Sequence, residues 1–328
     1  MRHRPVTRPL EGADDSAPLS DIASAYDCAG DSYVAYADGD PARPFAFDGT
    51  HGFSDRQVWS VLEHKLQGLR TAGRTSVRLL DAGCGPGTWL RRMVIYARQL
   101  GFSRITARGF DIAQAQITTA RRLAGDLVQQ PGVDFRFEVA DIDDRFPEAD
   151  GCVDLTLCLY SVLSHLQMDH LPYIAAELAR VTRGHFVTTV RATGGPPTIF
   201  IDSIDKARSF RLDRSLDRCE IELVDGRCIS LNFHLFRAHE LRRYFAPHFQ
   251  IDDLCGLDIF HHRFAPDQRW NPVSASENAD LASRLADLEE SYARHPAFMD
   301  SATHLLLIGT RLVDAKLGGR NGSSAPLR

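Results

Sequence analysis

The chain has 328 residues, of which 44% are apolar and 25% charged, and its formal net charge is -5 at pH 7. This composition is close to the average for soluble globular proteins, and the chain is long enough to bury a substantial core. The acidic balance excludes a general positive field, which disfavours a nucleic acid partner but leaves room for a local basic patch.

The two ends of the chain are polar. Residues 1–20 are rich in Pro, Arg and Asp, and residues 318–328 are rich in Gly and Ser. Neither stretch offers enough apolar surface to become ordered by burial, so we expect flexible ends.

Between residues 75 and 191, short apolar runs alternate with longer segments of helical periodicity. This alternation is typical of parallel strands joined by crossover helices, and it predicts a doubly wound α/β fold with helices on both faces of a mostly parallel, seven-stranded sheet. The expected strands are 77–81, 105–110, 135–139, 153–159, 185–190, 249–254 and 304–311. The expected helices are 89–100, 113–128, 171–181 and 238–245.

Two later segments interrupt this rhythm. Residues 219–236 alternate apolar and polar side chains around Asp225-Gly226, a turn signal that predicts a β-hairpin added to the core. Residues 279–294 carry apolar side chains at helical spacing, which predicts a helix that packs one face on the core or on a second copy of the chain. A homodimer is therefore one hypothesis.

Seven cysteines are scattered without any Cys-x-x-Cys spacing, which argues against a disulfide framework and a zinc ribbon. No run approaches the roughly 18 apolar residues of a membrane span. The arginines near the N-terminus have no apolar stretch behind them. We therefore expect reduced thiols in a cytoplasmic protein without a membrane partner.

The glycines at 83, 85 and 87 follow an apolar strand and precede a helix. Without a Cβ atom, such residues allow a tight turn and let a ligand lie against the backbone. A dinucleotide-binding loop would have glycine at position 88, where this chain has Thr88, so a nicotinamide cofactor is disfavoured.

The string from Leu79 to Thr88, an acidic residue followed by spaced glycines, resembles the first motif of the class I methyltransferase family. The resemblance implies an enzyme that uses S-adenosylmethionine as its cofactor. It also implies that the loop lies under the amino-acid end of that cofactor. The residues to which it assigns this role are Asp81, Ala82, Gly83, Cys84, Gly85 and Gly87.

Two aspartates follow the next strands. Asp111 ends the second strand and Asp141 follows the third, at the sheet edge where open parallel sheets bind ligands. The resemblance assigns the ribose to Asp111 and the adenine to Asp141 with Ile142, and Ile112 is a further candidate for cofactor binding. The alternative is that each aspartate caps a helix, a position that Asp favours.

The fourth expected strand leads into residues that the resemblance places nearest the reactive methyl group, namely Cys158, Leu159 and Tyr160. His165 is the candidate general base, because histidine titrates near neutral pH. The alternative for His165 is simple packing against the sheet, and Tyr160 is read as a wall of the cleft.

Three segments lie outside the cofactor-binding core: 21–75, and insertions at about 192–236 and 256–301 within a cofactor-binding domain of residues 76–317. In similar enzymes such segments form a lid, so 21–75 is interpreted as an N-terminal helical lid. Its tyrosines Tyr26, Tyr33 and Tyr36 are candidate lid residues, with packing as the alternative. Arg191 is a candidate partner for an acidic acceptor, or an ordinary surface arginine.

His239-Glu240 begins a zinc-protease pattern, but its second histidine is replaced by Arg243. We therefore predict no metal site, in spite of further histidines at 234, 261 and 262.

The hypothesis that follows is a methyltransferase acting on a small molecule at O, N or C, with the acceptor itself unidentified. The alternatives are a methyltransferase for RNA or protein, and a non-catalytic protein that binds S-adenosylmethionine.

Overall fold

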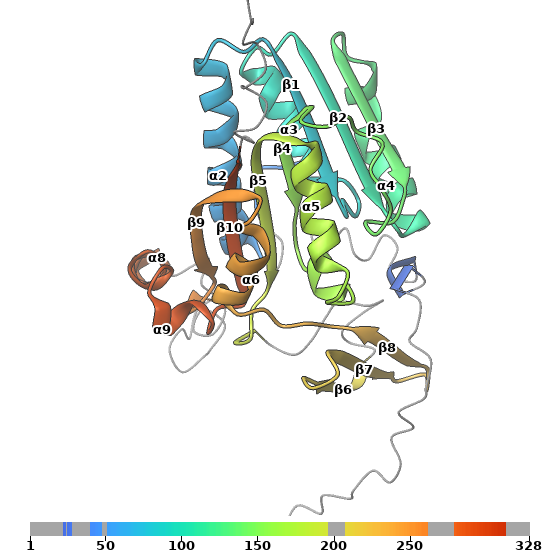
Figure 1. Ribbon diagram of the computed structural model, residues 1–328, viewed down its shortest axis with the longest axis vertical. Coiled ribbons are helices and arrows are strands. Elements are labelled where there is room, and N and C mark those ends of the chain that lie inside the picture. The colour runs from blue at the N-terminus through green and yellow to red at the C-terminus, as the bar shows by residue number, and fades with distance from the viewer. Residues whose placement is uncertain are drawn as a thin grey trace, which may run out of the picture.

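The computed structural model describes residues 22–23, 25–27, 40–47, 51–195, 207–261 and 279–312. Within these ranges, helices cover both faces of a seven-stranded sheet, and a smaller antiparallel sheet lies beside it (Figure 1). The predicted doubly wound α/β fold is confirmed. The lid prediction for Tyr33 and Tyr36 and the predicted flexible ends lie outside the described residues.

The large sheet has the strand order β3-β2-β1-β4-β5-β10-β9. Its strands are β1 (Ser76–Ala82), β2 (Arg104–Asp111), β3 (Val133–Val139), β4 (Val153–Cys158), β5 (Thr182–Arg191), β9 (Phe249–Leu257) and β10 (His304–Arg311). β10 runs antiparallel to both of its neighbours, β5 and β9, while β1 to β5 pair in parallel. The order reverses between β1 and β4, which makes the carboxyl ends of these strands the topological switch point.

Alternate residues of each strand face opposite layers. Leu79 packs under one layer with α2 (Gly52–Thr71), α3 (Thr88–Gln99) and α4 (Gln114–Ala124). Leu80 packs under the other layer with α5 (Leu171–Val181) and α6 (Ala238–Phe245). In Figure 1, α5 and α6 lie in front of the sheet and the other three lie behind it.

Two further helices, α8 (Ala279–Tyr292) and α9 (Pro296–Met299), lie at the β9 end of the sheet. None of the described helices combines the length and the apolar composition that a membrane crossing requires.

The helix predicted for residues 113–128 is shorter in the structure. α4 ends at Ala124, and a short 3-10 helix, η1 (Gly125–Gln129), follows it. Gly125 has a φ of 41°, outside the right-handed helical region, so the α-helix cannot continue through it. The periodicity of the side chains continues across this break, which is why the sequence pattern suggested one helix.

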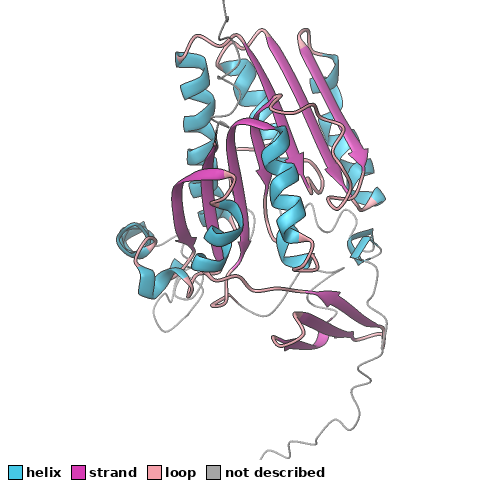
Figure 2. Cartoon of the chain, viewed as in Figure 1, coloured by secondary structure: helices cyan, strands magenta, loops and turns pink. Residues whose placement is uncertain are grey.

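The smaller sheet contains β6 (Ala207–Asp213), β7 (Arg218–Leu223) and β8 (Cys228–Asn232), all antiparallel (Figure 2). β7 and β8 form the predicted hairpin, and β6 is a third strand that the sequence pattern did not indicate. The sheet has its own small core, in which Cys219, Ile221 and Leu223 pack with Ala25 from the N-terminal segment.

Candidate functional site

A cavity lies at the carboxyl ends of β1, β2 and β4, at the switch point of the large sheet. It contains about 1460 Å³ not filled by protein atoms, open solvent at its mouth included. Its walls come from the loops after these strands, from the start of α2 and from the segment around Tyr26.

The glycine loop forms one wall and is fixed to β2. The backbone N–H groups of Gly83 and Cys84 both donate to the carbonyl of Phe110, at 2.8 and 2.9 Å. Gly87 has a φ of 79°, and a Cβ atom there would lie 2.5 Å from the ring of Phe137. Glycine is therefore required at this position by both backbone conformation and space.

Asp81 is the most unusual group in this wall. Its side chain is 1% exposed, and within the described residues nothing hydrogen-bonds its Oδ2 atom. Burial, and then the nearby carboxylate of Asp111, raise the pKa of Asp81 to about 7. A buried carboxylate of this kind is stabilised by a cation placed beside it, so the site is suited to a ligand amine.

Asp111 connects the glycine loop to the segment before α4. Its Oδ2 accepts from the backbone N–H of Gly85 and its Oδ1 from that of Ala113, both at 2.9 Å. Burial raises the pKa of Asp111, although these backbone hydrogen bonds oppose the rise. Each carboxylate oxygen keeps a further lone pair, so the group can also accept hydroxyl protons from a ligand. Ile112 lines the cavity next to it.

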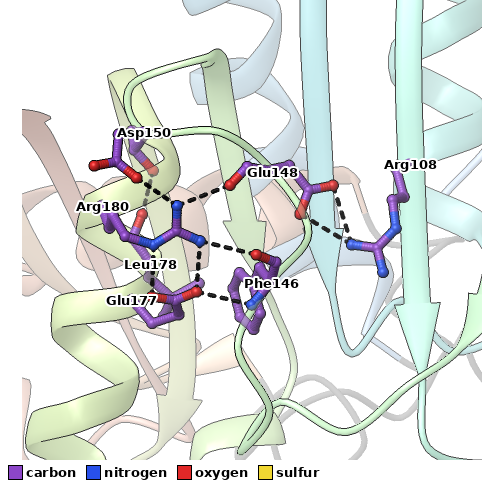
Figure 3. A network of polar contacts seen from close by, with 8 residues as sticks. Arg108, Phe146, Glu148, Asp150, Glu177, Leu178 and Arg180 are labelled. Carbon is purple, nitrogen blue, oxygen red and sulfur yellow. Dashed lines mark hydrogen bonds and ion pairs between the residues drawn. The ribbon is translucent and has the colours of Figure 1, made fainter.

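Asp141 and Ile142 line the cavity at the start of residues 140–152, a connection without helix or strand. Arg180 holds this connection in place (Figure 3). Its guanidinium donates to the carbonyls of Phe146 and Glu148, at 2.9 and 2.8 Å.

The network around Arg180 extends in two directions. Arg180 donates to Glu177 of α5, and Glu177 also accepts from the backbone N–H of Phe146. Glu148 is held from the other side by Arg108 of β2, at 3.0 Å. The network thus fixes the wall that carries Asp141 between α5 and the sheet.

The exit of β4 forms a wall next to the glycine loop, because β4 pairs with β1. Tyr160 and Ser161 have φ angles of 52° and 73°, a conformation that non-glycine residues adopt rarely and often at functional sites. The hydroxyl of Tyr160 donates to Asp55 of α2. Burial, and then Asp55, raise the pKa of Tyr160 well above its ordinary value, so the phenol keeps its proton.

Aromatic side chains surround Tyr160. Its ring stacks on Trp89 and on His51, at centroid distances of 5.9 and 6.0 Å, and meets the edge of His304 at 5.4 Å. All of these rings line the cavity. Together with Asp55 they form a part of the cavity that we call its recessed end, because Asp55 and His304 are almost fully buried.

His165 ends the short helix η2 (Val162–His165) and lines the cavity. Its Nδ1 lies 3.1 Å from the carbonyl of Asn232, and its Nε2 lies 3.0 Å from the hydroxyl of Tyr26. Burial lowers the pKa of His165 to about 4, so the ring is neutral at pH 7. Nδ1 then donates to Asn232, and Nε2 accepts from Tyr26.

Arg191 lies at the end of β5 and is only 7% exposed, so it is not a surface arginine. It lines the cavity, and its Nη1 donates to Nε2 of His304 at 3.4 Å.

The cavity brings together most of the site residues expected from the sequence. Those that line it are Asp81, Gly83, Cys84, Gly85, Asp111, Ile112, Asp141, Ile142, Leu159, Tyr160, His165, Tyr26 and Arg191. Three others lie outside its lining. Ala82 is buried in the core, Gly87 forms the start of α3, and Cys158 is buried, with its carbonyl accepting from Thr188.

Sequence reasoning missed His51, Asp55, Trp89 and His304. His304 begins β10, and because β10 is antiparallel its first residue lies at the same edge as the ends of the parallel strands. Once the last strand had been assigned, its antiparallel direction could have indicated that His304 lies near the site. His51 and Asp55 belong to the start of α2, a helix that no motif identified.

His234 and His261 are not among the residues that line this cavity. In the part of the chain that the structure describes, no group of three or more His, Cys, Asp or Glu side chains is arranged to hold a metal ion. His234 lies instead between Asp217 and Glu240, His261 stacks on Phe53, and position 262 is outside the described residues.

Comparison with known proteins gives one match to a family and several to solved structures. The model of the family described as "methyltransferase domain" matches residues 79–185. The sequence has no significant match among curated proteins.

Three of the similar solved structures are methyltransferases. An S-adenosylmethionine-dependent methyltransferase from Mesorhizobium loti is 19% identical, with 72% of this chain and 91% of that chain covered and a TM-score of 0.42. Magnesium protoporphyrin IX methyltransferase from Synechocystis PCC 6803 is 13% identical, with 86% and 94% covered and a TM-score of 0.44. A geranyl diphosphate methyltransferase is 19% identical, with 87% and 96% covered and a TM-score of 0.45.

Proposed function

We propose that the chain, whose residues 79–185 match a methyltransferase domain, uses S-adenosylmethionine to methylate a small molecule at O, N or C. One observation carries this proposal. The cavity that contains the glycine loop and its aspartates continues without interruption into the recessed end around Tyr160 and Asp55. A cofactor and an acceptor would therefore have adjoining places in one cavity.

The residues of the glycine-loop side fit the cofactor. Asp81, with a buried and unsatisfied oxygen, would take the amine, and Asp111 would take the ribose hydroxyls. Asp141 and Ile142, beside them, would take the adenine. When bound, S-adenosylmethionine supplies a methyl group that is activated by the positive charge of its sulfonium. Holding two reactants in alignment is worth about 7 to 11 kcal/mol of a reaction barrier.

The recessed end of the cavity supports a small acceptor. Asp55 and His304 are 3% and 2% exposed, so this end is walled by buried side chains. A compact molecule can occupy such a recess as a whole, as small ligands usually do. Tyr160 keeps its proton at the phenolic oxygen and is oriented by Asp55, so it can donate a hydrogen bond to a polar acceptor group only by leaving Asp55.

His165 is a poor general base in this arrangement. Its Nε2 lone pair already accepts from Tyr26, and its low pKa makes the neutral ring a weak proton acceptor. We propose that His165 instead orients Tyr26 over the cavity, so that an acceptor proton leaves by another route.

Calorimetric titration of the purified chain with S-adenosylmethionine, S-adenosylhomocysteine and NAD tests the proposal. We expect micromolar binding of the two sulfur compounds and none of NAD. Absence of binding by both sulfur compounds would refute the proposed function. The acceptor class is tested by incubating the chain with methyl-labelled cofactor and a cell extract. Label that enters only RNA or protein contradicts a small-molecule acceptor.

The ribose role of Asp111 gives a sharper prediction. Asp111→Ala should weaken S-adenosylmethionine binding by about tenfold or more, because it removes charge-assisted hydrogen bonds of about 1.5 to 3 kcal/mol each. Asp126→Ala, in the exposed turn η1, is the matched control and should leave the affinity unchanged. Circular dichroism checks that both variants fold. Unchanged affinity in a folded Asp111→Ala variant would contradict the ribose assignment.

A further inference from the structure

His234 lies in the short link between β8 and α6 and is sandwiched between two carboxylates. Its Nδ1 lies 2.7 Å from Oδ2 of Asp217, and its Nε2 lies 3.1 Å from Oε2 of Glu240. The side chain is only 14% exposed. This histidine is outside the cavity and has no part in the proposed reaction.

This geometry requires a charged ring. A neutral imidazole has one N–H donor and one lone pair, so it can donate to only one of two carboxylates. The other ring nitrogen would then direct its lone pair at a carboxylate oxygen, which is repulsive. Both contacts are hydrogen bonds only when His234 is an imidazolium, with a proton on each nitrogen.

The surroundings of His234 favour that state. Burial alone lowers its pKa, but the hydrogen bonds of the ring to Glu240 and Asp217 outweigh burial and raise the pKa above the ordinary value. The helix η2 also packs here, and its Ser164 carbonyl accepts from the backbone N–H of His234 at 2.8 Å. Its other titratable group, His165, is neutral at pH 7.

The two carboxylates belong to different parts of the molecule. Asp217 lies between β6 and β7 of the smaller sheet, and Glu240 lies in the first turn of α6, which packs on the large sheet. The protonated ring therefore joins the two sheets. Protonation of one side chain thus affects how firmly the smaller sheet is held.

The smaller sheet is connected to the cavity through the segment around Tyr26 and through His165. We call β6–β8 together with residues 22–23 and 25–27 the cover, because Ile22 and Ala25 pack on this sheet and Ile22 and Tyr26 line the cavity. The cover touches His165 twice, through the carbonyl of Asn232 and the hydroxyl of Tyr26.

The cover is also attached to α4. The side chain of Gln116 donates to the Tyr26 carbonyl at 3.1 Å, and the backbone N–H of Ala115 donates to Asp27 at 2.8 Å. These contacts do not involve a titrating histidine, so they remain when His234 loses its proton.

We propose that protonated His234 holds the cover closed over the cavity by bridging Asp217 and Glu240, and that loss of its proton loosens the cover and speeds ligand exchange. The proposal rests on the proposed function only for the identity of the ligand. Because the folded-state pKa of His234 is raised, its stabilising contribution is complete below about pH 6.5 and is lost as the pH rises through the raised value.

Hydrogen exchange of the backbone amides of β7 and β8, in the free protein, measures the cover directly. Between about pH 6 and pH 9 we expect their protection factors to fall by about tenfold, the effect of losing one charge-assisted hydrogen bond. The protection of β1 and β4 also follows the titration of Asp81, so it should change with pH equally in the unmodified chain and in a variant without His234. Stopped-flow dissociation of S-adenosylhomocysteine should accelerate by a similar factor over the same pH range.

His234→Gln removes the charge and should give, at about pH 6, the low protection that the unmodified chain has at about pH 9, with no further pH dependence. Glu240→Gln should also lower the protection at about pH 6, and it replaces His234→Gln as the test if that variant fails to fold. His170→Gln is the matched control, because His170 pairs with Asp143 at 3.0 Å away from the cover. It should leave the pH dependence intact.

Two failures are distinguishable. If the chain does not bind S-adenosylhomocysteine but the protection of β7 and β8 still depends on pH and on His234, the proposed function fails and the role of His234 in holding the cover stands. If the ligand binds but protection is equal at both pH values, or His234→Gln leaves it pH-dependent, the inference about His234 is overturned.

Discussion

At the scale of single residues, the site contains two buried carboxylates whose ionised forms are unfavourable in the protein without a ligand. Asp81 is buried, and Asp111 lies near enough to raise its pKa further. Two such carboxylates are costly to keep ionised together away from water. A cationic ligand group reverses this cost, so part of the binding energy comes from relieving a repulsion already present in the protein.

Asp81 therefore makes stability depend on pH. Its pKa is about 7 in the folded chain and 3.8 in the ordinary state, so the folded chain binds an extra proton between these values. The stability that this group contributes is complete below about pH 4 and is lost as the pH rises through about 7. The free energy of unfolding of Asp81→Asn, relative to the unmodified chain, should accordingly increase from about pH 4 to pH 7.

Urea unfolding of both proteins across this range measures the difference. His165, whose depressed pKa gives the opposite slope, is present in both proteins and cancels. Asp126→Asn, at an exposed position, is the control and should show no trend. A difference between Asp81→Asn and the unmodified chain that is flat with pH would contradict the raised pKa.

The residues that sequence alone could identify were those with a local motif. The glycine loop and the aspartates after the second and third strands are read from their neighbours in the chain, and the structure places them around one cavity. Asp55 and His304 have no such motif. They meet Tyr160 only because α2 and β10 are brought to the same edge of the sheet, a relation of tertiary structure that no short pattern encodes.

At the scale of elements, the connection between β3 and β4 depends on side chains for its shape. Residues 140–152 form no helix or strand, and Arg180 with Glu177 replaces the hydrogen bonds that a regular element would supply (Figure 3). We expect Arg180→Leu to lower the free energy of unfolding by about 3 kcal/mol, because it leaves the buried carboxylate of Glu177 without its partner.

Urea unfolding tests this expectation. The double variant Arg180→Leu with Glu177→Leu is the control, since removing both partners should recover much of the loss. Arg136→Leu, at an exposed pair with Asp134, should cost little. A loss for Arg180→Leu no larger than that of Arg136→Leu would contradict the role of the network.

Sequence patterns also identified most of the elements of the large sheet, because buried parallel strands are continuous apolar runs. They failed where the pattern was ambiguous. β6 carries Arg208 and Arg211 in a charged stretch, and it becomes a strand only by pairing with β7. Likewise, the break between α4 and η1 depends on the conformation of Gly125, which side-chain periodicity does not report.

At the scale of the whole molecule, the cavity connects ligand binding to the stability of both layers. Its walls come from α2, the ends of β1, β2, β4 and β5, and the start of β10. A ligand that fills it should therefore stabilise the folded chain as a unit. At one hundred times the dissociation constant the gain is about 2.7 kcal/mol, which for a chain of this size raises Tm by about 5 °C.

Thermal unfolding with S-adenosylhomocysteine and, as the control, with NAD checks this prediction. Asp111→Ala should need about tenfold more S-adenosylhomocysteine for the same rise in Tm. Equal shifts with S-adenosylhomocysteine and NAD would indicate non-specific stabilisation and contradict the prediction.

The position of β10 has a consequence for how the protein is made. β5 and β9 do not pair with each other, and β10, the last strand of the sheet, lies between them. While the ribosome has yet to synthesise residues 304–311, β5 and β9 both present unpaired edges, which are prone to association with other chains. His304, at the start of this strand, also completes the wall around Tyr160. The nascent chain thus remains exposed to aggregation, and without a finished cavity, until its last strand is in place.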